Sequence, residues 1–527
     1  MNNPKHANDL LLTGGRVFGG TQWNQPQWNE AVFVKQGHIV AVGGSDDLRR
    51  ALGDVREIDL SGNLLLPGLG DAHIHMMLGG KSFGMLDLGG MSLDQIRQEL
   101  RQVALSASDI KDQWVIAFNW DRSYCPFDAS ILDEIVPDVE VIVYGKDLHC
   151  CCCNTKALET AGITTMNFDP VGGVIECDER QRPTGMLYEA AVGMMDKFVS
   201  KPSAGILRLN ILDAQEHLLS LGLTAVSEVL EIGAEKLFRQ LDHEGELILE
   251  VDGWRRIEQW DGQSVPPLDG NRFRVRTLKI FLDGSFGSNT AALNDPYQDA
   301  PDKDGILFYT DNELEERLLP AVQAGWRLAM HAIGDKAVAQ ACRVLQRLPH
   351  VEFSGSHRIE HAQLLPDNGV DLFLQSRAIA SIQPIHLLDD QRWLRDRLGV
   401  DRIRRSFVWR SLIDSGVTLA MGTDWPVASS DPLLNIHTAI NRCGFGDEPN
   451  PDFDITEAIL PHTAIRVATF GWATAAGVSD RRGVIEPEYS ADFTVVSGVS
   501  DDLRDWSRAQ VVMTICRGKV VFQKQEI

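Results

Sequence analysis

The stretch Leu64–His75, LLLPGLGDAHIH, combines an apolar run with two histidines placed two residues apart. A short apolar run that ends in polar residues is typical of a buried strand. On a strand, residues two apart point to the same side, so His73 and His75 are able to bind one ion together. The pair alone decides little, because an HxH pattern also occurs by chance. The rest of the chain determines how it is interpreted.

Seven further apolar stretches alternate with helical segments. They lie at 223–229, 246–254, 274–284, 326–335, 356–363, 378–384 and 417–426. With 64–75 they make eight, the number of strands in a (β/α)8 barrel. After 326–335 the apolar residues recur at helical spacing, and Asp335 is predicted to cap that helix. We therefore predict an α/β fold, a (β/α)8 TIM barrel.

Two parts of the chain do not follow the barrel pattern. Residues 1–67 and 480–527 contain short β-type runs broken by turn residues, so the two termini are predicted to complete one β domain. The barrel is predicted to span 68–479. Within it, the segment 81–222 is too long for a single connection and is predicted to be an insertion.

Length and composition favour a small-molecule substrate. The 527 residues are 44% hydrophobic and 24% charged, as in average globular proteins. No apolar run is long enough to cross a bilayer and the N-terminus lacks the pattern of a signal peptide, so we expect a cytoplasmic protein without a membrane partner. The net charge of -24 would repel nucleic acid, which argues against that partner too. A homodimer is the default expectation.

Polar residues follow the ends of the predicted strands. Because the carboxyl ends of parallel barrel strands open on one face, we expect these side chains to meet there. Unpaired polar groups at buried positions cost stability, and one shared metal site would explain them all. Imidazole and carboxylate ligands suit zinc most readily, although iron, manganese, cobalt and nickel are compatible. The candidates are His73, His75, His331, His361 and Asp424.

Lys279 lies in TLKIFLDG, where alternation places it on one face with Phe281 and Asp283. A lysine buried beside metal ions loses proton affinity, and its neutral amine is able to add carbon dioxide and become a carbamate that bridges two ions. The spacing fits equally well a lysine paired with Asp283 or another acid. The residues alone leave both interpretations open.

Taken in order, these motifs resemble the amidohydrolase superfamily, and within it the YtcJ-like branch that includes N-substituted formamide deformylases. The matching stretches span almost the whole chain and are LLLPGLGDAHIH, PTGMLYEAA, LKIFLDGSFGSNTAAL, MHAIGDKAV, HRIEHAQ, SIQPIH, MGTDWPV and ADFTVV. The resemblance implies a distorted (β/α)8 barrel, a small β-sandwich built from both termini and an insertion after the first barrel strand.

The resemblance also implies hydrolysis at a centre of one or two divalent ions, by a metal-activated hydroxide. Of the four histidines, the first two would bind the more buried ion and the other two the second, with a carbamate on Lys279 between them. Asp424 would act as general acid/base and pass a proton to the departing amine. The expected reaction is cleavage of a C–N bond other than a peptide bond, in an N-substituted or cyclic amide. The implied ligands are His73, His75, Lys279, His331, His361 and Asp424.

Further residues in the matched motifs are candidates for substrate binding. His149 and Asn154 resemble the branch's pattern of a histidine, a few small residues and an asparagine. Asp283 and Ser285 also fit a role in ordering a loop, and Trp425 fits packing. The predicted substrate-binding residues are His149, Asp283, Ser285, Gln383, His386 and Trp425.

The segment LHCCCCN places four cysteines, Cys150–Cys153, beside His149. Neighbours on an extended chain point to opposite sides and cannot easily close around one zinc ion. The C-x-x-C spacing of Cys150 and Cys153 leaves a redox pair open. Because buried cysteine behaves as a small hydrophobic residue, we interpret the run as a packed segment that positions His149, ahead of a helix beginning near Asn154.

Two other functions fit parts of the sequence. A mononuclear deaminase of the same superfamily would carry a glutamate shortly after the histidine of the fifth strand, and HAIGD has none. A non-catalytic binding or regulatory protein on the same barrel is the alternative from another class. Deamination would also leave Lys279 unexplained, so amide hydrolysis is favoured over it. The complete set of potential ligands favours catalysis over the binding role.

Overall fold

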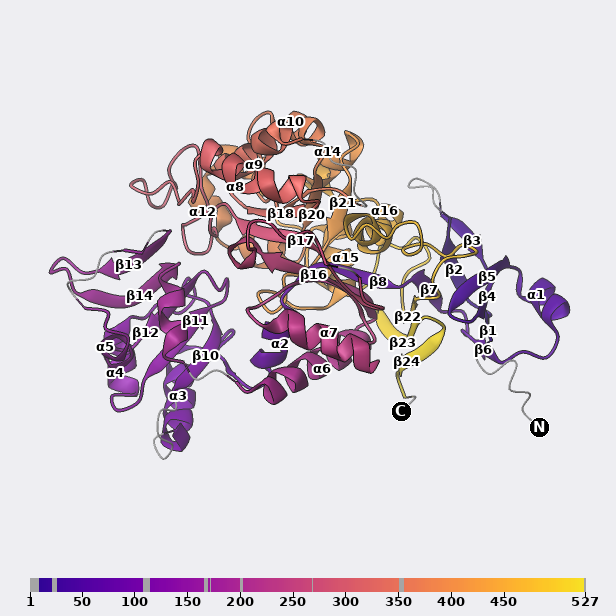
Figure 1. Ribbon diagram of the computed structural model, residues 1–527, viewed down its shortest axis with the longest axis horizontal. Coiled ribbons are helices and arrows are strands. Elements are labelled where there is room, and N and C mark those ends of the chain that lie inside the picture. The colour runs from indigo at the N-terminus through magenta and orange to yellow at the C-terminus, as the bar shows by residue number, and fades with distance from the viewer. Residues whose placement is uncertain are drawn as a thin grey trace. The chain divides into compact units, whose positions relative to one another are not determined.

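The computed structural model of the protein describes residues 9–20, 26–107, 114–164, 169–170, 172–199, 202–267, 269–349 and 355–525. Figure 1 labels most of its helices and strands. The chain divides into two units, the first made of residues 1–77, 211–282 and 309–527 and the second of 78–210 and 283–308. In the described ranges, no helix is both long and apolar enough to cross a lipid bilayer.

Eight parallel strands form the central sheet of the first unit. Their order runs from β21 to β15 and then to β8, so neighbours in the sheet are successive strands of the barrel. The strands are β8 (Leu69–Ile74), β15 (Leu223–Val229), β16 (Glu250–Arg256), β17 (Phe273–Phe281), β18 (Arg327–Ala332), β19 (Arg358–His361), β20 (Ile379–Ile382) and β21 (Leu419–Met421). They coincide with the eight predicted stretches, and the predicted fold class is confirmed.

The first and last strands of the sheet, β8 and β21, meet without forming a regular ladder. Asp424 N donates to the carbonyl of His73 at 2.7 Å, and His75 N donates to the carbonyl of Trp425 at 2.9 Å. A side chain at Gly422 would place its Cβ 2.4 Å from the backbone nitrogen of His73, so only glycine permits this approach. The barrel is therefore closed by the loop that follows β21.

Helices cover the outside of the barrel strands. The helix α9 (Asp335–Arg347) buries Val338, Ala341, Cys342 and Leu345, a spacing that forms one apolar stripe, and it packs on β18. It begins at Asp335, with Gly334 as the N-cap, so the prediction that Asp335 caps this helix was wrong by one residue. Asp335 instead places its charge in the first turn, where the helix dipole favours it.

The other helices of the first unit follow the strands in sequence. They are α7 (Ala234–Glu244), α8 (Asp311–Gln323), α10 (Gly369–Ser376), α11 (His386–Asp390), α12 (Leu394–Leu398), α13 (Val400–Ile403), α14 (Trp409–Asp414), α15 (Pro432–Asn441), α16 (Pro461–Arg466) and α17 (Trp472–Ala475). Two more, α2 (Met76–Ser82) and α6 (Ala204–Ser220), lie at the junctions with the second unit.

Strands from both chain ends form two further sheets in the first unit. One has the order β5-β4-β1-β6 and the other β24-β23-β22-β7-β2-β3. Leu12, Val32, Leu65, Phe493 and Ile515 belong to one buried cluster that takes residues from both sheets. This gives a small sandwich, with the C-terminal strands shown in yellow in Figure 1. The elements are β1 (Leu10–Thr13), β2 (Arg16–Gly19), β3 (Gln27–Asn29), β4 (Ala31–Lys35), β5 (His38–Gly43), α1 (Ser45–Leu52), β6 (Glu57–Asp59), β7 (Leu64–Pro67), β22 (Phe493–Ser497), β23 (Gln510–Cys516) and β24 (Lys519–Gln523).

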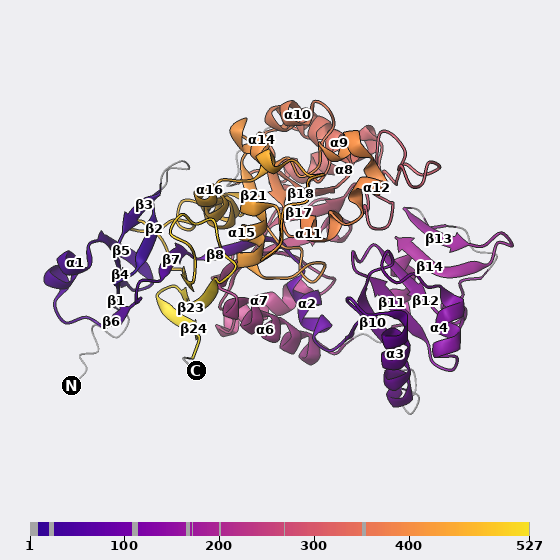
Figure 2. The ribbon, with the colours of Figure 1, turned by 180° about the vertical axis from the view of Figure 1, so that it is seen from behind.

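The second unit has its own six-stranded sheet, with the order β13-β14-β12-β11-β10-β9, visible in Figure 2. It is built from β9 (Leu86–Asp87), α3 (Leu93–Ala107), β10 (Val115–Trp120), α4 (Ala129–Ile135), β11 (Val141–Gly145), β12 (Cys150–Cys153), α5 (Thr155–Thr160), β13 (Gly173–Cys177) and β14 (Pro183–Glu189). Residues 283–308, which follow barrel strand β17, also belong to this unit.

The four adjacent cysteines form β12, an inner strand of this sheet, and all four are buried. Cys150 and Cys152 pack in one apolar cluster, whereas Cys151 and Cys153 pack in another. Cys150 and Cys153 therefore face opposite sides, which is incompatible with a redox pair. Asn154 caps α5 by accepting a hydrogen bond from Ala157 N at 3.0 Å, so the predicted packed segment and helix start are both confirmed.

Candidate metal centre

The barrel brings the predicted metal ligands to the carboxyl ends of its strands. His73 lies near the end of β8, Lys279 near the end of β17, and His331 near the end of β18. His361 is the last residue of β19, and Asp424 follows β21 by three residues. Because parallel strands end at one face, residues up to 351 positions apart in the chain lie close together in the barrel.

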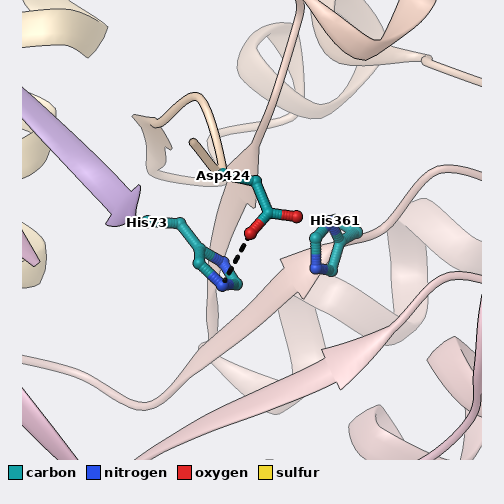
Figure 3. Close-up of side chains that lie close together, drawn as sticks. All are labelled: His73, His361 and Asp424. Atoms are coloured by element: carbon teal, nitrogen blue, oxygen red, sulfur yellow. Dashed lines mark ion pairs between the residues drawn. The ribbon is translucent and has the colours of Figure 1, made fainter. Parts of the chain in front are cut away.

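Asp424 lies at the centre of this group. Its Oδ1 is 3.6 Å from Nε2 of His73 and 3.1 Å from Nε2 of His75. His73, His361 and Asp424 offer three ligand atoms that all lie within 4.8 Å of one another. Figure 3 shows the two carboxylate oxygens facing the two imidazoles. The ring of His331 lies 4.5 Å from that of His361, which places a further imidazole at the cluster.

The backbone is unusual at this centre. His361, Ala362 and Asp424 have φ angles of 72°, 45° and 61°, a region that side chains other than glycine's rarely adopt. Such conformations persist only where the surrounding structure imposes them, and they cluster at functional sites. At His361 the left-handed turn breaks the alternation of the strand, so His361 and the preceding Glu360 both face the barrel interior.

Burial sets the protonation of the histidines. Burial, followed by the charge of Lys279, lowers the pKa of His73 well below its ordinary value. Burial, followed by the neighbouring His331, lowers the pKa of His361 in the same way. Both imidazoles are therefore neutral at neutral pH, which is the form that binds metal ions.

Asp424 is ionised. Burial by itself would raise the pKa of its carboxyl group, but the imidazoles beside it, among them His75 with Nε2 at 3.1 Å, lower the pKa below the ordinary value. The cluster thus presents neutral nitrogen donors and an anionic oxygen donor, the set that a borderline divalent ion prefers.

Lys279 extends into the same group. Its Nζ lies 3.3 Å from Nε2 of His73, and the side chain is buried. No carboxylate lies within ion-pairing distance of Nζ in the part of the chain that the structure describes. Burial lowers the pKa of Lys279 to about 8, against the opposing effect of Glu360.

The residues fit a divalent ion. Nδ1 of His361 is buried and has no hydrogen-bond partner within the described ranges. Orphaned buried polar atoms are costly unless something binds them. Ligand atoms around one tetrahedral zinc ion lie roughly 3.3–3.6 Å apart. The 3.6 Å between His73 Nε2 and Asp424 Oδ1 matches this spacing.

Three predicted substrate-binding residues belong to the barrel, and two of them, His386 and Trp425, lie beside Asp424. Nε2 of His386 is 4.0 Å from Oδ2 of Asp424, and Gln363 donates towards the other ring nitrogen of His386 at 3.5 Å. Gln383 is buried directly after β20, and its Oε1 has no hydrogen-bond partner among the described residues. Trp425 stacks on His217, with 5.4 Å between ring centroids, so part of its surface serves packing.

The other three, His149, Asp283 and Ser285, belong to the second unit. His149 shares a hydrogen bond of 2.8 Å with Glu189 through Nδ1. Asp283 accepts from Ala292 N at 3.0 Å, and Ser285 donates to Asp147 at 2.5 Å. The contacts of Asp283 and Ser285 are those of residues that order a loop.

Sequence reasoning assigned no role to the two carboxylates that support the ligands. Asp71 accepts hydrogen bonds from the backbone nitrogens of His73 and Thr423, at 3.0 and 3.1 Å, and so holds the two sides of the barrel closure together. Glu360 contacts the ring of His73 directly. The motif DAHIH places Asp71 among the polar residues at the strand ends, whereas strand alternation would have put Glu360 on the face opposite His361.

A parallel eight-stranded barrel with neutral histidines and an ionised aspartate at its strand ends defines a metal-dependent hydrolase. The chain belongs to the amidohydrolase family, whose family model matches residues 56–522.

Relatives of similar length support this assignment. YtcJ of Bacillus subtilis is 29% identical over 97% of this chain and 99% of its own. N-substituted formamide deformylase of Arthrobacter pascens is 24% identical over 94% of this chain and 95% of its own. Among solved structures, an uncharacterized metal-dependent hydrolase from Pyrococcus horikoshii is 27% identical, with a TM-score of 0.75 over 95% of this chain and 99% of that one.

Proposed function

We propose that the protein hydrolyses a C–N bond other than a peptide bond, in an N-substituted or cyclic amide of a small molecule. The observation that carries this proposal is the ionised Asp424 between His73, His75 and His361, because such a carboxylate is suited to moving a proton beside a metal centre. The relative named N-substituted formamide deformylase supports the choice of an amide.

In this proposal, different residues of the chain bind the metal, transfer the proton and orient the substrate. The ligand set of four histidines, Lys279 and Asp424 holds one or two divalent ions, with zinc as the first choice. A bound ion would lower the pKa of water to roughly 7 and polarise the scissile carbonyl. Asp424 accepts the proton that the attacking water loses and donates it to the nitrogen of the departing amine as the C–N bond breaks. Gln383, His386 and Trp425 line the approach to Asp424 and orient the substrate.

Lys279 is proposed to carry a carbamate. Carbon dioxide adds to the neutral Nζ, a C–N bond forms and the nitrogen loses a proton, which leaves an anionic group able to bind two ions. The neutral amine is required, and with a pKa of about 8 it makes up roughly a tenth of Lys279 at pH 7 and about half at pH 8. We therefore expect metal-stripped protein to regain activity faster when metal is added with dissolved carbon dioxide than with metal alone.

At a constant concentration of dissolved carbon dioxide, the rate of reactivation should rise about fivefold from pH 7 to pH 8, as the neutral fraction does. The initial rate of activity recovery measures this. Lys279→Met should lose the dependence on carbon dioxide, whereas Lys519→Met, an exposed lysine on β24, should keep it. If the rate at which the unaltered protein recovers activity does not depend on carbon dioxide, the carbamate is ruled out.

The reaction class is tested with a panel of N-substituted formamides, other amides, hydantoins, carbamates and esters. Each compound is incubated with protein loaded with zinc, manganese, cobalt or nickel, and release of amine or acid is followed. We expect turnover of amides or cyclic amides and little of simple esters. Turnover confined to aromatic amines with release of ammonia would instead identify a deaminase, and metal-loaded protein inert towards the whole panel would favour a binding role.

A further inference from the structure

A carboxylate inside the barrel contacts one of the candidate metal ligands. Oε2 of Glu360 lies 2.8 Å from Nδ1 of His73, and both side chains are buried, with 0% and 1% of their surface exposed. Glu360 belongs to β19 and His73 to β8, two strands that are not neighbours in the sheet. The contact therefore crosses the barrel interior rather than following the ladder of hydrogen bonds.

Arg358 forms a buried ion pair with this carboxylate. It lies two residues before Glu360 on the same face of β19, and its Nε donates to Oε1 of Glu360. A buried carboxylate without a cation would be expensive, and a guanidinium group is the partner best able to compensate for that cost. Arg358 also donates to the carbonyl of Ala72 at 2.7 Å and to Oγ of Ser381 at 2.6 Å.

These contacts determine which nitrogen of His73 carries its proton. A carboxylate that pairs with a guanidinium group accepts hydrogen bonds, so Nδ1 of His73 is the donor to Glu360. The neutral ring then has its lone pair on Nε2. That atom lies 3.6 Å from Oδ1 of Asp424 and 3.3 Å from Nζ of Lys279, at the centre of the cluster.

From this arrangement we infer that Glu360 is a positioning residue of the metal centre, which holds His73 in the Nδ1–H tautomer with Nε2 directed at the ion, while Arg358 anchors Glu360. The inference rests on the proposed function in one respect, namely that a metal ion binds at His73. Histidines that bind metal ions commonly donate their second ring nitrogen to a carboxylate, and loss of that carboxylate weakens metal binding by roughly 10–100-fold.

The backbone conformation explains how one strand provides both a ligand and its support. In a regular strand, Glu360 and His361 would point to opposite faces. The φ of 72° at His361 turns that side chain back to the interior, so β19 contributes His361 to the cluster and Glu360 to His73. The strained conformation at His361 thus allows two successive residues, Glu360 and His361, to serve the same site.

The test compares metal affinity in three proteins. Glu360→Gln keeps the size of the side chain and removes its charge. Glu250→Gln makes the same change at a buried glutamate of β16 that pairs with Arg482 at 3.5 Å, and so reproduces the loss of a buried ion pair. The dissociation constant for Zn²⁺ is measured by competition with a chelator, and the melting temperature of each metal-free protein is recorded. The absorption spectrum of the Co²⁺-loaded proteins reports the geometry of the site.

We expect Glu360→Gln to bind Zn²⁺ roughly 10–100-fold more weakly and to alter the Co²⁺ spectrum, while Glu250→Gln lowers the melting temperature without either effect. Equal affinity in Glu360→Gln and the unaltered protein would overturn the inference, as would an equal loss in Glu250→Gln. If Glu360→Gln does not fold, Glu360→Asp, which keeps the charge at a shorter reach, is judged by the same measurements. Unaltered protein that binds none of the divalent ions would instead contradict the proposed function itself.

Discussion

Replacing Asp424 by asparagine should reduce kcat for amide hydrolysis by roughly 10²–10⁴-fold and leave the metal in place. Asparagine has nearly the same shape and an oxygen that still binds an ion, but it cannot accept and release a proton near neutral pH. The four histidines remain as ligands. The measurement is kcat of the metal-loaded variant together with its metal content per chain.

The matched control is Asp431→Asn, seven residues further along the same loop. Asp431 caps α15 by accepting from Leu433 N at 2.9 Å, and asparagine caps helices about as well as aspartate. This variant should keep both turnover and metal. Normal turnover in Asp424→Asn would remove Asp424 from the proton-transfer role, and loss of its metal would show that Asp424 acts first as a ligand.

Strand positions in the barrel could be predicted from the sequence because an apolar run that ends in polar residues is a strong local signal of a buried strand. Each of the eight predicted stretches overlaps one strand of the sheet. The stretch 64–75 is divided between β7, which joins the terminal sheets, and β8, which opens the barrel. The division falls at Gly68, where a Cβ would lie 2.2 Å from the side chain of Thr224.

Interactions across the barrel could not be predicted in the same way. Alternation along β19 separates Glu360 from His361, and only the left-handed conformation at His361 brings them to one side. That conformation depends on contacts with other strands, such as Ala362 N donating to the carbonyl of Ala332 at 3.0 Å. A pattern read along one strand carries no information about such contacts.

Local sequence patterns also could not predict which segments of the chain make up the second unit. Residues 283–308 follow the barrel strand that carries Lys279, yet they cluster with the inserted segment. Asp147 accepts hydrogen bonds from Ser285 and Ser288, at 2.5 and 2.6 Å, which ties this stretch to the sheet of the second unit. These pairs are about 140 residues apart in sequence. Polar contacts at such separation leave no periodic signal in the chain.

A second large effect is expected at His361. His361→Ala should lose both metal binding and hydrolysis. Removal of a residue that only supports a ligand weakens metal affinity by roughly 10–100-fold, and the loss of affinity in His361→Ala should be larger. His361 is one of the three residues whose ligand atoms lie within 4.8 Å of one another, and its Nδ1 has no hydrogen-bond partner in the described part of the chain. Alanine offers no donor atom, so two of the clustered donors remain.

The contrast between His361→Ala and Asp424→Asn separates binding from chemistry, since the first removes the metal and the second only turnover. His437→Ala provides the control, because His437 on α15 is also buried and its ring contacts Asn441 rather than the cluster. It should lose some thermal stability and keep its metal. Metal content and kcat are measured for all three variants. A His361→Ala protein with full metal content and full turnover would mean that the ion lies elsewhere, and the cluster of His73, His361 and Asp424 would then need another explanation for its orphaned buried atoms.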